Sequence, residues 1–304
     1  EQDLKEFREL FFKKFPDVPK SDFVNGVYAI DSGLREQWEA FEEFPSYEIY
    51  IDKGEEQFNK SFANGKGFAD CFPNYKKGIR QNYPYFDTKS NKVVTLESAI
   101  NKCRTDNGEK AWKWKTGNIA YVSAYLAYLS RGNKLNIKVP NDRNALAAYN
   151  RGKKHYYSKR GQLNMACADC HVTFPGSKVR ANILSPALGQ PTGFPAYRNK
   201  WAGASTKGDG MGTIHRRYGG CNKQVRAKPF KAQSDEYRSL EYFHTFMSNG
   251  LEVNGPSQPM KSPTPTHKKP RQAGVFFQLQ HMHQAKRVSF GQHTWYLIPS
   301  PSYL

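Results

Sequence analysis

Five consecutive residues near the middle of the chain, Cys167-Ala168-Asp169-Cys170-His171, constrain its fold more than any other feature of the sequence. Two thiols at this spacing, followed at once by a histidine, form the attachment sequence of a c-type haem. Each thiol can form a thioether to a haem vinyl group, and the histidine can then ligate the iron. We therefore expect one covalently bound haem c, held by Cys167, Cys170 and His171.

The same residues allow three other interpretations: a chance pair of cysteines, a redox dithiol, or half of a zinc site. A structural zinc site needs further ligands at short spacing, and no second pair of that kind accompanies this motif. A thioredoxin-like dithiol belongs to a βαβ unit, which the Gly- and Lys-rich surroundings do not predict. Haem attachment is therefore favoured, and because it normally takes place outside the bacterial cytoplasm, we expect a periplasmic protein.

Composition limits the remaining classes. The length of 304 residues predicts two domains, and 38% hydrophobic residues suffice for real cores. No run of 18 apolar residues occurs, so we expect no membrane-spanning helix. The net charge of +19 calls for an acidic partner or surface. No nucleic-acid-binding motif organises the basic residues, so we expect no nucleic-acid partner. The start at Glu1, without Met, is what we expect where a leader peptide has been removed or omitted.

The haem motif has a degenerate copy about a hundred residues earlier in the chain. The triplet Ala-Asp-Cys occurs at 168–170 and again at 69–71, and superposing the two aligns Phe68 with Cys167 and Phe72 with His171. The first copy has therefore lost a thiol and the proximal ligand. We expect a mainly α fold of two tandem cytochrome c-like domains, of which the N-terminal one holds no haem.

The far ends of the two copies also agree. Apolar segments with helical spacing stop at Gly132 and at Gly250, as glycine-capped helices do. Counting back equally from these glycines gives Cys103 and Cys221. In the first copy, Cys103 would face Cys71 across a vacated pocket. In an oxidising compartment we expect a Cys71–Cys103 disulfide, the alternative being two unrelated buried thiols.

These correspondences give four segments. We expect an N-terminal extension at 1–50 that contacts a partner, a haem-free domain at 51–140, and a haem domain at 141–257. The segment 258–304 is a basic, Pro-rich extension with no acidic residue, to which we assign no role. Its histidines His281 and His283 invite a metal-binding interpretation, which two histidines alone do not favour.

The sequence alone does not decide which side chain is the distal ligand of the iron. Candidates downstream of the motif are Met211, Met247, His215, His244 and Cys221. Met211 lies in a Gly-rich segment that reads as a flexible loop, whereas Met247 and His244 fall in the closing helix and read as packing residues.

Cys221 is left over once the disulfide and two thioethers are assigned, which indicates a reactive thiol or an iron ligand. Arg217 lies four residues before it and could lower its pKa or hold an anionic substrate. The alternatives are an inert buried cysteine and an arginine on a solvated basic face.

With C-x-x-C-H, the stretch Arg217-x-x-x-Cys221-Asn222 and the following Arg226 resemble the A subunits of the sulfur-oxidising cytochrome SoxAX. The first half adds Tyr83-Pro-Tyr-Phe-Asp87 ahead of Leu96-Glu97 and Cys103. The resemblance covers about residues 50 to 257. It points to the single-haem branch of the family, because residues 68–72 have lost the first site.

The resemblance implies an enzyme of thiosulfate oxidation, an L-cysteine S-thiosulfotransferase. His171 would be the proximal iron ligand, and Cys221 would be the distal one, bearing an extra sulfur as a persulfide. Arg217 and Arg226 would hold thiosulfate, because two guanidinium groups suit a tetrahedral dianion.

The resemblance also implies partners. Thiosulfate would be joined to a cysteine of the carrier protein SoxYZ, and electrons would pass through the haem to the small cytochrome SoxX, the other subunit of a heterodimer. The alternative function is a monohaem electron-transfer or sulfur-sensing cytochrome, in which Cys221 or Met211 only ligates the iron.

Overall fold

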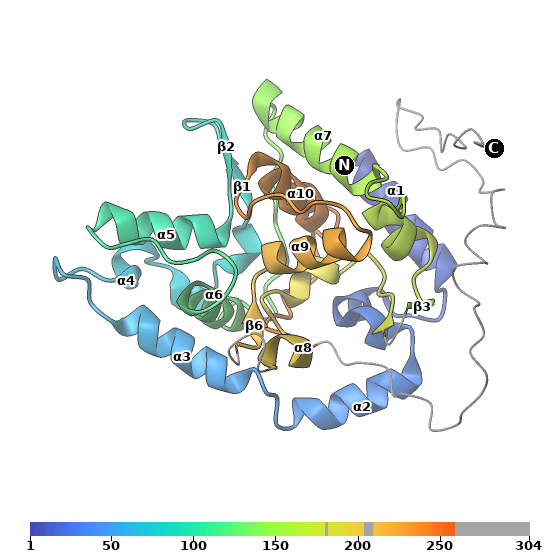
Figure 1. Ribbon diagram of the computed structural model, residues 1–304, viewed down its shortest axis with the longest axis horizontal. Coiled ribbons are helices and arrows are strands. Elements are labelled where there is room, and N and C mark those ends of the chain that lie inside the picture. Colours follow the sequence, from blue (N-terminus) through green and yellow to red (C-terminus); the bar gives the residue numbers. More distant parts are fainter. Residues whose placement is uncertain (180–181, 204–208, 259–304) are drawn as a thin grey trace.

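The computed structural model describes residues 1–179, 182–203 and 209–258. Helices dominate these residues, and the short strands among them form three two-stranded antiparallel pairs (Figure 1). The mainly α fold is confirmed. No helix in these ranges has the length and apolar character needed to cross a membrane. The histidines His281 and His283 lie outside the described residues.

The N-terminal residues form α1 (Gln2–Lys14), a 3-10 helical stretch (Lys20–Ala29) and α2 (Ser32–Glu42). Phe7 and Phe11 lie on one face of α1, as residues four apart do, and both are buried in the same core as residues of the second half. Asp3 ties the helix to that half, because its Oδ2 lies 2.8 Å from Lys153 Nζ. A contact between residues 1–50 and a partner stays a prediction.

From α3 onward the described chain runs twice through a similar order of elements (Figure 1). The first half consists of α3 (Glu48–Asn59), α4 (Phe68–Cys71), β1 (Tyr85–Asp87), β2 (Lys92–Val94), α5 (Leu96–Asp106) and α6 (Asn118–Tyr128). The second consists of α7 (Arg143–Tyr157), a π-helical turn (Asp169–Thr173), β3 (Lys178–Val179), β4 (Asn182–Ile183), β5 (Ala196–Tyr197), α8 (Asn199–Ala202), β6 (Met211–Gly212), α9 (Ile214–Gln224) and α10 (Asp235–Phe246). The domain boundaries 51–140 and 141–257 stay predictions.

The first and last helices of each half cross at a glycine. A Cβ on Gly54 of α3 would lie 2.2 Å from the carbonyl oxygen of Tyr121 in α6. A Cβ on Gly152 of α7 would lie 1.9 Å from the carbonyl oxygen of Ser239 in α10. Only glycine allows the backbones to approach this closely, so the two glycines set the same helix packing in both halves.

The segments that follow α6 and α10 pair with each other. Gly132 donates its N–H to the carbonyl of Val253 at 3.2 Å, and Gly250 donates to the carbonyl of Leu135 at 2.8 Å. Both glycines have positive φ, near 79° and 77°, which suits a helix C-terminus. Each half therefore satisfies backbone groups of the other through equivalent residues.

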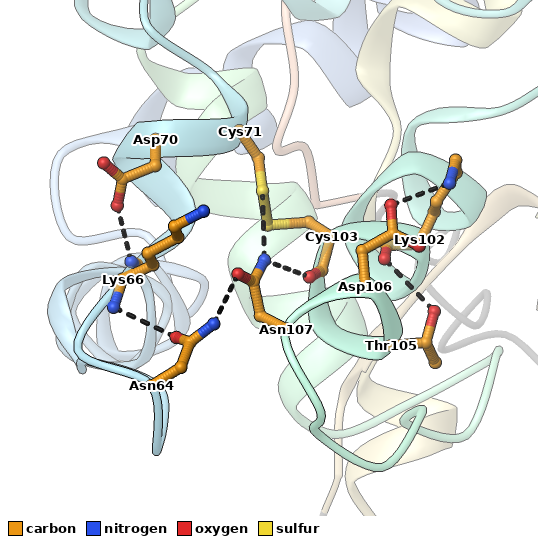
Figure 2. Close-up of a disulfide and its surroundings, with 10 residues drawn as sticks. Asn64, Lys66, Asp70, Cys71, Lys102, Cys103, Thr105, Asp106 and Asn107 are labelled. Atoms are coloured by element: carbon orange, nitrogen blue, oxygen red, sulfur yellow. Dashed lines mark hydrogen bonds and ion pairs between the residues drawn. A yellow bond between two sulfur atoms is a disulfide. The ribbon is translucent and has the colours of Figure 1, made fainter.

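A disulfide between Cys71 and Cys103 joins α4 to α5, which confirms the predicted pair (Figure 2). Phe68 and Phe72 are 1% and 6% exposed, and the Phe68 ring stacks on Phe58 with centroids 5.6 Å apart. These rings fill the interior at the positions where the second half has Cys167 and His171.

Candidate functional site

The Ala-Asp-Cys triplet folds the same turn in both halves. Asp169 accepts the N–H of Ala166 on its Oδ2 at 2.7 Å, and Asp70 accepts the N–H of Gly67 in the same way at 2.7 Å. A carboxylate that satisfies a free N–H stabilises the first turn of a helix. The aspartate thus has a structural role, and in the second half the turn that it stabilises presents the C-x-x-C-H side chains.

The ring of His171 is oriented by the loop that follows it. Its Nδ1 lies 2.9 Å from the carbonyl oxygen of Ser185, and Gln190 Nε2 donates to the Ser185 hydroxyl at 3.0 Å. A carbonyl can only accept, so Nδ1 is the donor of this hydrogen bond. Metal-ligating histidines are commonly oriented by such a hydrogen bond.

Cys221 lies on α9, partly buried, and hydrogen-bonds His171. Burial raises the pKa of its thiol, but Arg217, His171 and Arg198 together lower it by more, so that the pKa falls to about 7. The two expected iron ligands therefore face each other, and Cys221 is a thiolate over much of the neutral range.

The two cysteines of the motif differ from Cys221. Burial, followed by the charge of Cys221, raises the pKa of Cys167 to about 12 and that of Cys170 to about 11. The mutual influence of the three sulfurs shows that they lie close together. The structure thus brings together two neutral thiols, an oriented imidazole and a thiolate.

These donors fit a haem c better than a bare metal ion. Within the described ranges, no group of three or more His, Cys, Asp or Glu residues is arranged to hold a metal ion. The Tyr156 hydroxyl and Arg160 Nε are buried without a hydrogen-bond partner, and both residues lie near Cys167. Unsatisfied polar atoms beside the motif are expected where a polar prosthetic group belongs.

Two arginines lower the pKa of Cys221, and of these only Arg217 was predicted from the sequence. Arg217 exerts the largest lowering effect on its pKa. Arg198 is partly buried and lies beside Arg217 and Cys221. Burial, and then the charge of Arg217, lower the pKa of Arg198 to about 10. The predicted Arg226 is instead exposed, and its Nη1 lies 3.5 Å from Oε1 of Gln162.

No sequence motif points to Arg198. It directly follows β5, and β5 pairs with β6, whose Met211 lies opposite Tyr197. Helix α9 begins two residues after β6, so the strand pairing carries Arg198 toward the helix that bears Cys221. Strands of two residues leave no alternation pattern that could have predicted this contact.

The four other candidates for the distal position lie in packed surroundings. Met211 is not in a flexible loop as expected: it belongs to β6 and is fully buried in the core of the first half. Met247 is buried and accepts a 3.7 Å contact from the Tyr149 hydroxyl. His215 Nε2 lies 3.0 Å from Glu241 Oε2, and both side chains are buried.

His244 comes nearest to the site without replacing Cys221. Its Nδ1 lies 3.0 Å from the Tyr218 hydroxyl, and burial, helped by nearby His171, lowers its pKa to about 3. The ring is therefore neutral and packed within the core. Of the five candidates for the distal position, Cys221 is the one that hydrogen-bonds His171.

A C-x-x-C-H turn, an oriented histidine and a facing thiolate, set between helices that pack alike in both halves, are the features of a c-type cytochrome. Residues 53–135 match the family model described as "SoxA/TsdA, cytochrome c domain". The match falls on the half in which phenylalanines replace the first cysteine and the histidine of the C-x-x-C-H motif.

Comparison of the whole chain extends this result. It is 54% identical over 255 residues to the L-cysteine S-thiosulfotransferase subunit SoxA of Chlorobaculum tepidum, covering 84% of this chain and 86% of that protein. It is 50% identical to the protein of the same name from Allochromatium vinosum, covering 84% and 89%. The crystal structure of SoxXA from P. pantotrophus matches with a TM-score of 0.65 and 31% identity, covering 74% of this chain and 84% of that one. The chain belongs to the SoxA family.

Proposed function

We propose that the protein is an L-cysteine S-thiosulfotransferase subunit that joins thiosulfate oxidatively to a cysteine of a carrier protein. The observation that carries the proposal is the position of Cys221, a thiol of lowered pKa beside Arg217 and Arg198 and opposite His171. The names of the relatives support the same activity.

Cys167 and Cys170 would hold one haem c by thioethers, and His171 and Cys221 would ligate its iron. The oriented ring of His171 and the lowered pKa of Cys221 support this assignment. When bound, a haem c supplies an iron that accepts one electron at a time.

The reaction forms one S–S bond between the outer sulfur of thiosulfate and the carrier's sulfur. The carrier's thiol loses its proton, and the two electrons released need an acceptor, which a bound haem c and a partner cytochrome would supply. Arg198 and Arg217 bind the thiosulfate dianion and orient it beside Cys221, because guanidinium groups match tetrahedral oxyanions. We further propose that Cys221 carries an extra sulfur as a persulfide, which the lowered pKa and nucleophilic character of its thiol support.

The proposed partners are a small SoxX-type cytochrome subunit, in a heterodimer, and a SoxYZ-type carrier. A SoxXA structure among the structural relatives supports the first, and the names of the sequence relatives support a cysteine-bearing acceptor. We propose a periplasmic location, which covalent haem attachment and the Cys71–Cys103 disulfide support.

Replacing Cys221 tests the function. Cys221→Met keeps a sulfur that can ligate iron but removes the thiol. We expect conjugation of thiosulfate to the carrier to fall about 1000-fold or more, while the absorption spectrum still shows six-coordinate haem. The matched control is the double variant Cys71→Ser/Cys103→Ser, which removes two other cysteines and should keep the activity. Full activity in Cys221→Met would overturn the enzyme assignment and favour an electron-transfer cytochrome.

A further inference from the structure

Arg198 lies beside Cys221 without a carboxylate to hold it there. No Asp or Glu side chain pairs with it in the part of the chain that the structure describes, and the neighbouring charge of Arg217 repels it. Its pKa of about 10 leaves the guanidinium charged at neutral pH. Two cations this close push each other apart, so another group must keep Arg198 in place.

Trp201 of α8 makes that contact. The centre of its ring lies 5.6 Å from the guanidinium carbon of Arg198, and its backbone N–H donates to the carbonyl oxygen of Arg198 at 2.7 Å. The face of an indole ring attracts a cation, and tryptophan does so better than the other aromatic residues. The ring therefore holds the guanidinium without neutralising its charge.

The indole ring is itself fixed by α9, the helix that carries the reactive sulfur. The guanidinium carbon of Arg216 lies 4.3 Å from the centre of the Trp201 ring. Arg216 cannot easily move away, because its Nη1 donates to the carbonyl oxygens of Asp209 and Met211 at 3.0 and 2.9 Å. Trp201 thus contacts two arginines and connects Arg198 to α9.

Gly212 of β6 leaves the space that this arrangement needs. A Cβ at this position would lie 2.6 Å from Cζ3 of Trp201 and 2.6 Å from Cδ of Arg216. Any larger residue would displace one of the two side chains. The glycine that suggested a loop in the sequence therefore serves the packing of Trp201 against Arg216.

We propose that Trp201 is a positioning residue for thiosulfate binding, which holds Arg198 against the repulsion of Arg217 so that both guanidinium groups meet the dianion beside Cys221. The inference rests on the proposed function and deepens it. Trp201 acts through Arg198 and not by touching the anion. An arginine that is already in place loses less conformational freedom when the anion binds, and this raises the affinity.

A double-mutant cycle between Trp201 and Arg198 tests the proposal. Isothermal titration of thiosulfate into the haem-loaded protein, without carrier, gives the Kd of the unaltered protein, Trp201→Leu, Arg198→Gln and the double variant. Trp201→Leu should raise the Kd about 3- to 10-fold, because it removes a partly buried cation–π contact. In the Arg198→Gln background it should raise the Kd less than about twofold, because the group that the indole holds is already gone.

Two further variants separate positioning from a general loss of stability. Trp112→Leu removes the same kind of contact from the first half, where the guanidinium carbon of Arg104 lies 4.0 Å from the indole centre, and it should leave the Kd within about twofold. Trp201→Phe keeps an aromatic face and should restore most of the affinity. In steady-state assays Trp201→Leu should raise the KM for thiosulfate and leave kcat within about twofold.

Three results would overturn the proposal: an unchanged Kd in Trp201→Leu, the same fold-change of Kd in both backgrounds, or no recovery in Trp201→Phe. The proposed function fails separately, because neither the carrier nor conjugation enters the titration. If Cys221→Met kept full conjugation while the effects of Trp201 and Arg198 on the Kd were non-additive, the enzyme assignment would fail and the role of Trp201 would stand.

Discussion

Three free cysteines lie around His171, and their surroundings give them different chemistry. Burial raises the pKa of Cys167 and Cys170 to about 12 and 11, so both stay protonated at neutral pH. Arg217, His171 and Arg198 overcome the effect of burial at Cys221 and lower its pKa to about 7. Only the thiolate is a strong nucleophile and iron ligand, so position separates the two protonated thiols from the thiolate of Cys221.

At the scale of single residues, substitutions of the arginines give the sharpest prediction. Arg198→Gln and Arg217→Gln should each raise the KM for thiosulfate about 10- to 100-fold, because each removes a charged hydrogen-bond donor worth about 1.5–3 kcal/mol. Arg226→Gln is the matched control and should change it less than about twofold, because Arg226 is exposed and directed to Gln162. Steady-state kinetics at saturating carrier measure the effect. An unchanged KM in Arg198→Gln, or an equal rise in Arg226→Gln, would contradict the assignment.

At the scale of helices, a glycine in each half fixes how its first and last helices cross. Ser239 leaves no room for a Cβ on Gly152, whereas the atom nearest to a Cβ on Gly33 of α2 is 3.7 Å away. Gly152→Ala should therefore lower the free energy of unfolding by about 1–3 kcal/mol. Gly33→Ala should leave it unchanged or raise it by up to about 1 kcal/mol. Urea unfolding of both variants checks this, and similar values for the two would refute the packing argument.

The sequence predicts these elements unevenly, for physical reasons. Ala-Asp-Cys could be recognised twice because Asp70 and Asp169 each satisfy a backbone N–H at 2.7 Å, a role that preserves residue and spacing. The C-x-x-C-H motif can likewise be recognised from the sequence, because its residues lie next to one another in the chain. Arg198 could not be found, since its approach to Cys221 depends on strands of two residues. Met211 was misplaced for the same reason: its glycine neighbours suggested a loop, yet it lies in β6 and is fully buried.

At the scale of the whole molecule, equivalent positions of the two halves form different interactions. Glu97 of α5 accepts the Ser123 hydroxyl at 2.9 Å, and at the corresponding positions of α9 and α10 His215 lies 3.0 Å from Glu241. Burial and then the charge of Glu241 raise the pKa of Glu97, which shows that the two pairs meet in one interior. The half without the haem motif thus supports the helix that positions Cys221, while its own former pocket is filled by phenylalanines and closed by a disulfide.

The central claim is that one half holds a haem while a separate cysteine carries out sulfur chemistry. The intact mass of the protein from its native compartment, before and after mild reduction, tests it most directly. We expect one covalent haem on the peptide containing Cys167 and Cys170, and a reducible extra sulfur that peptide mapping places on Cys221. A protein with no haem would contradict the whole account, and one haem with an unmodified Cys221 would contradict the persulfide.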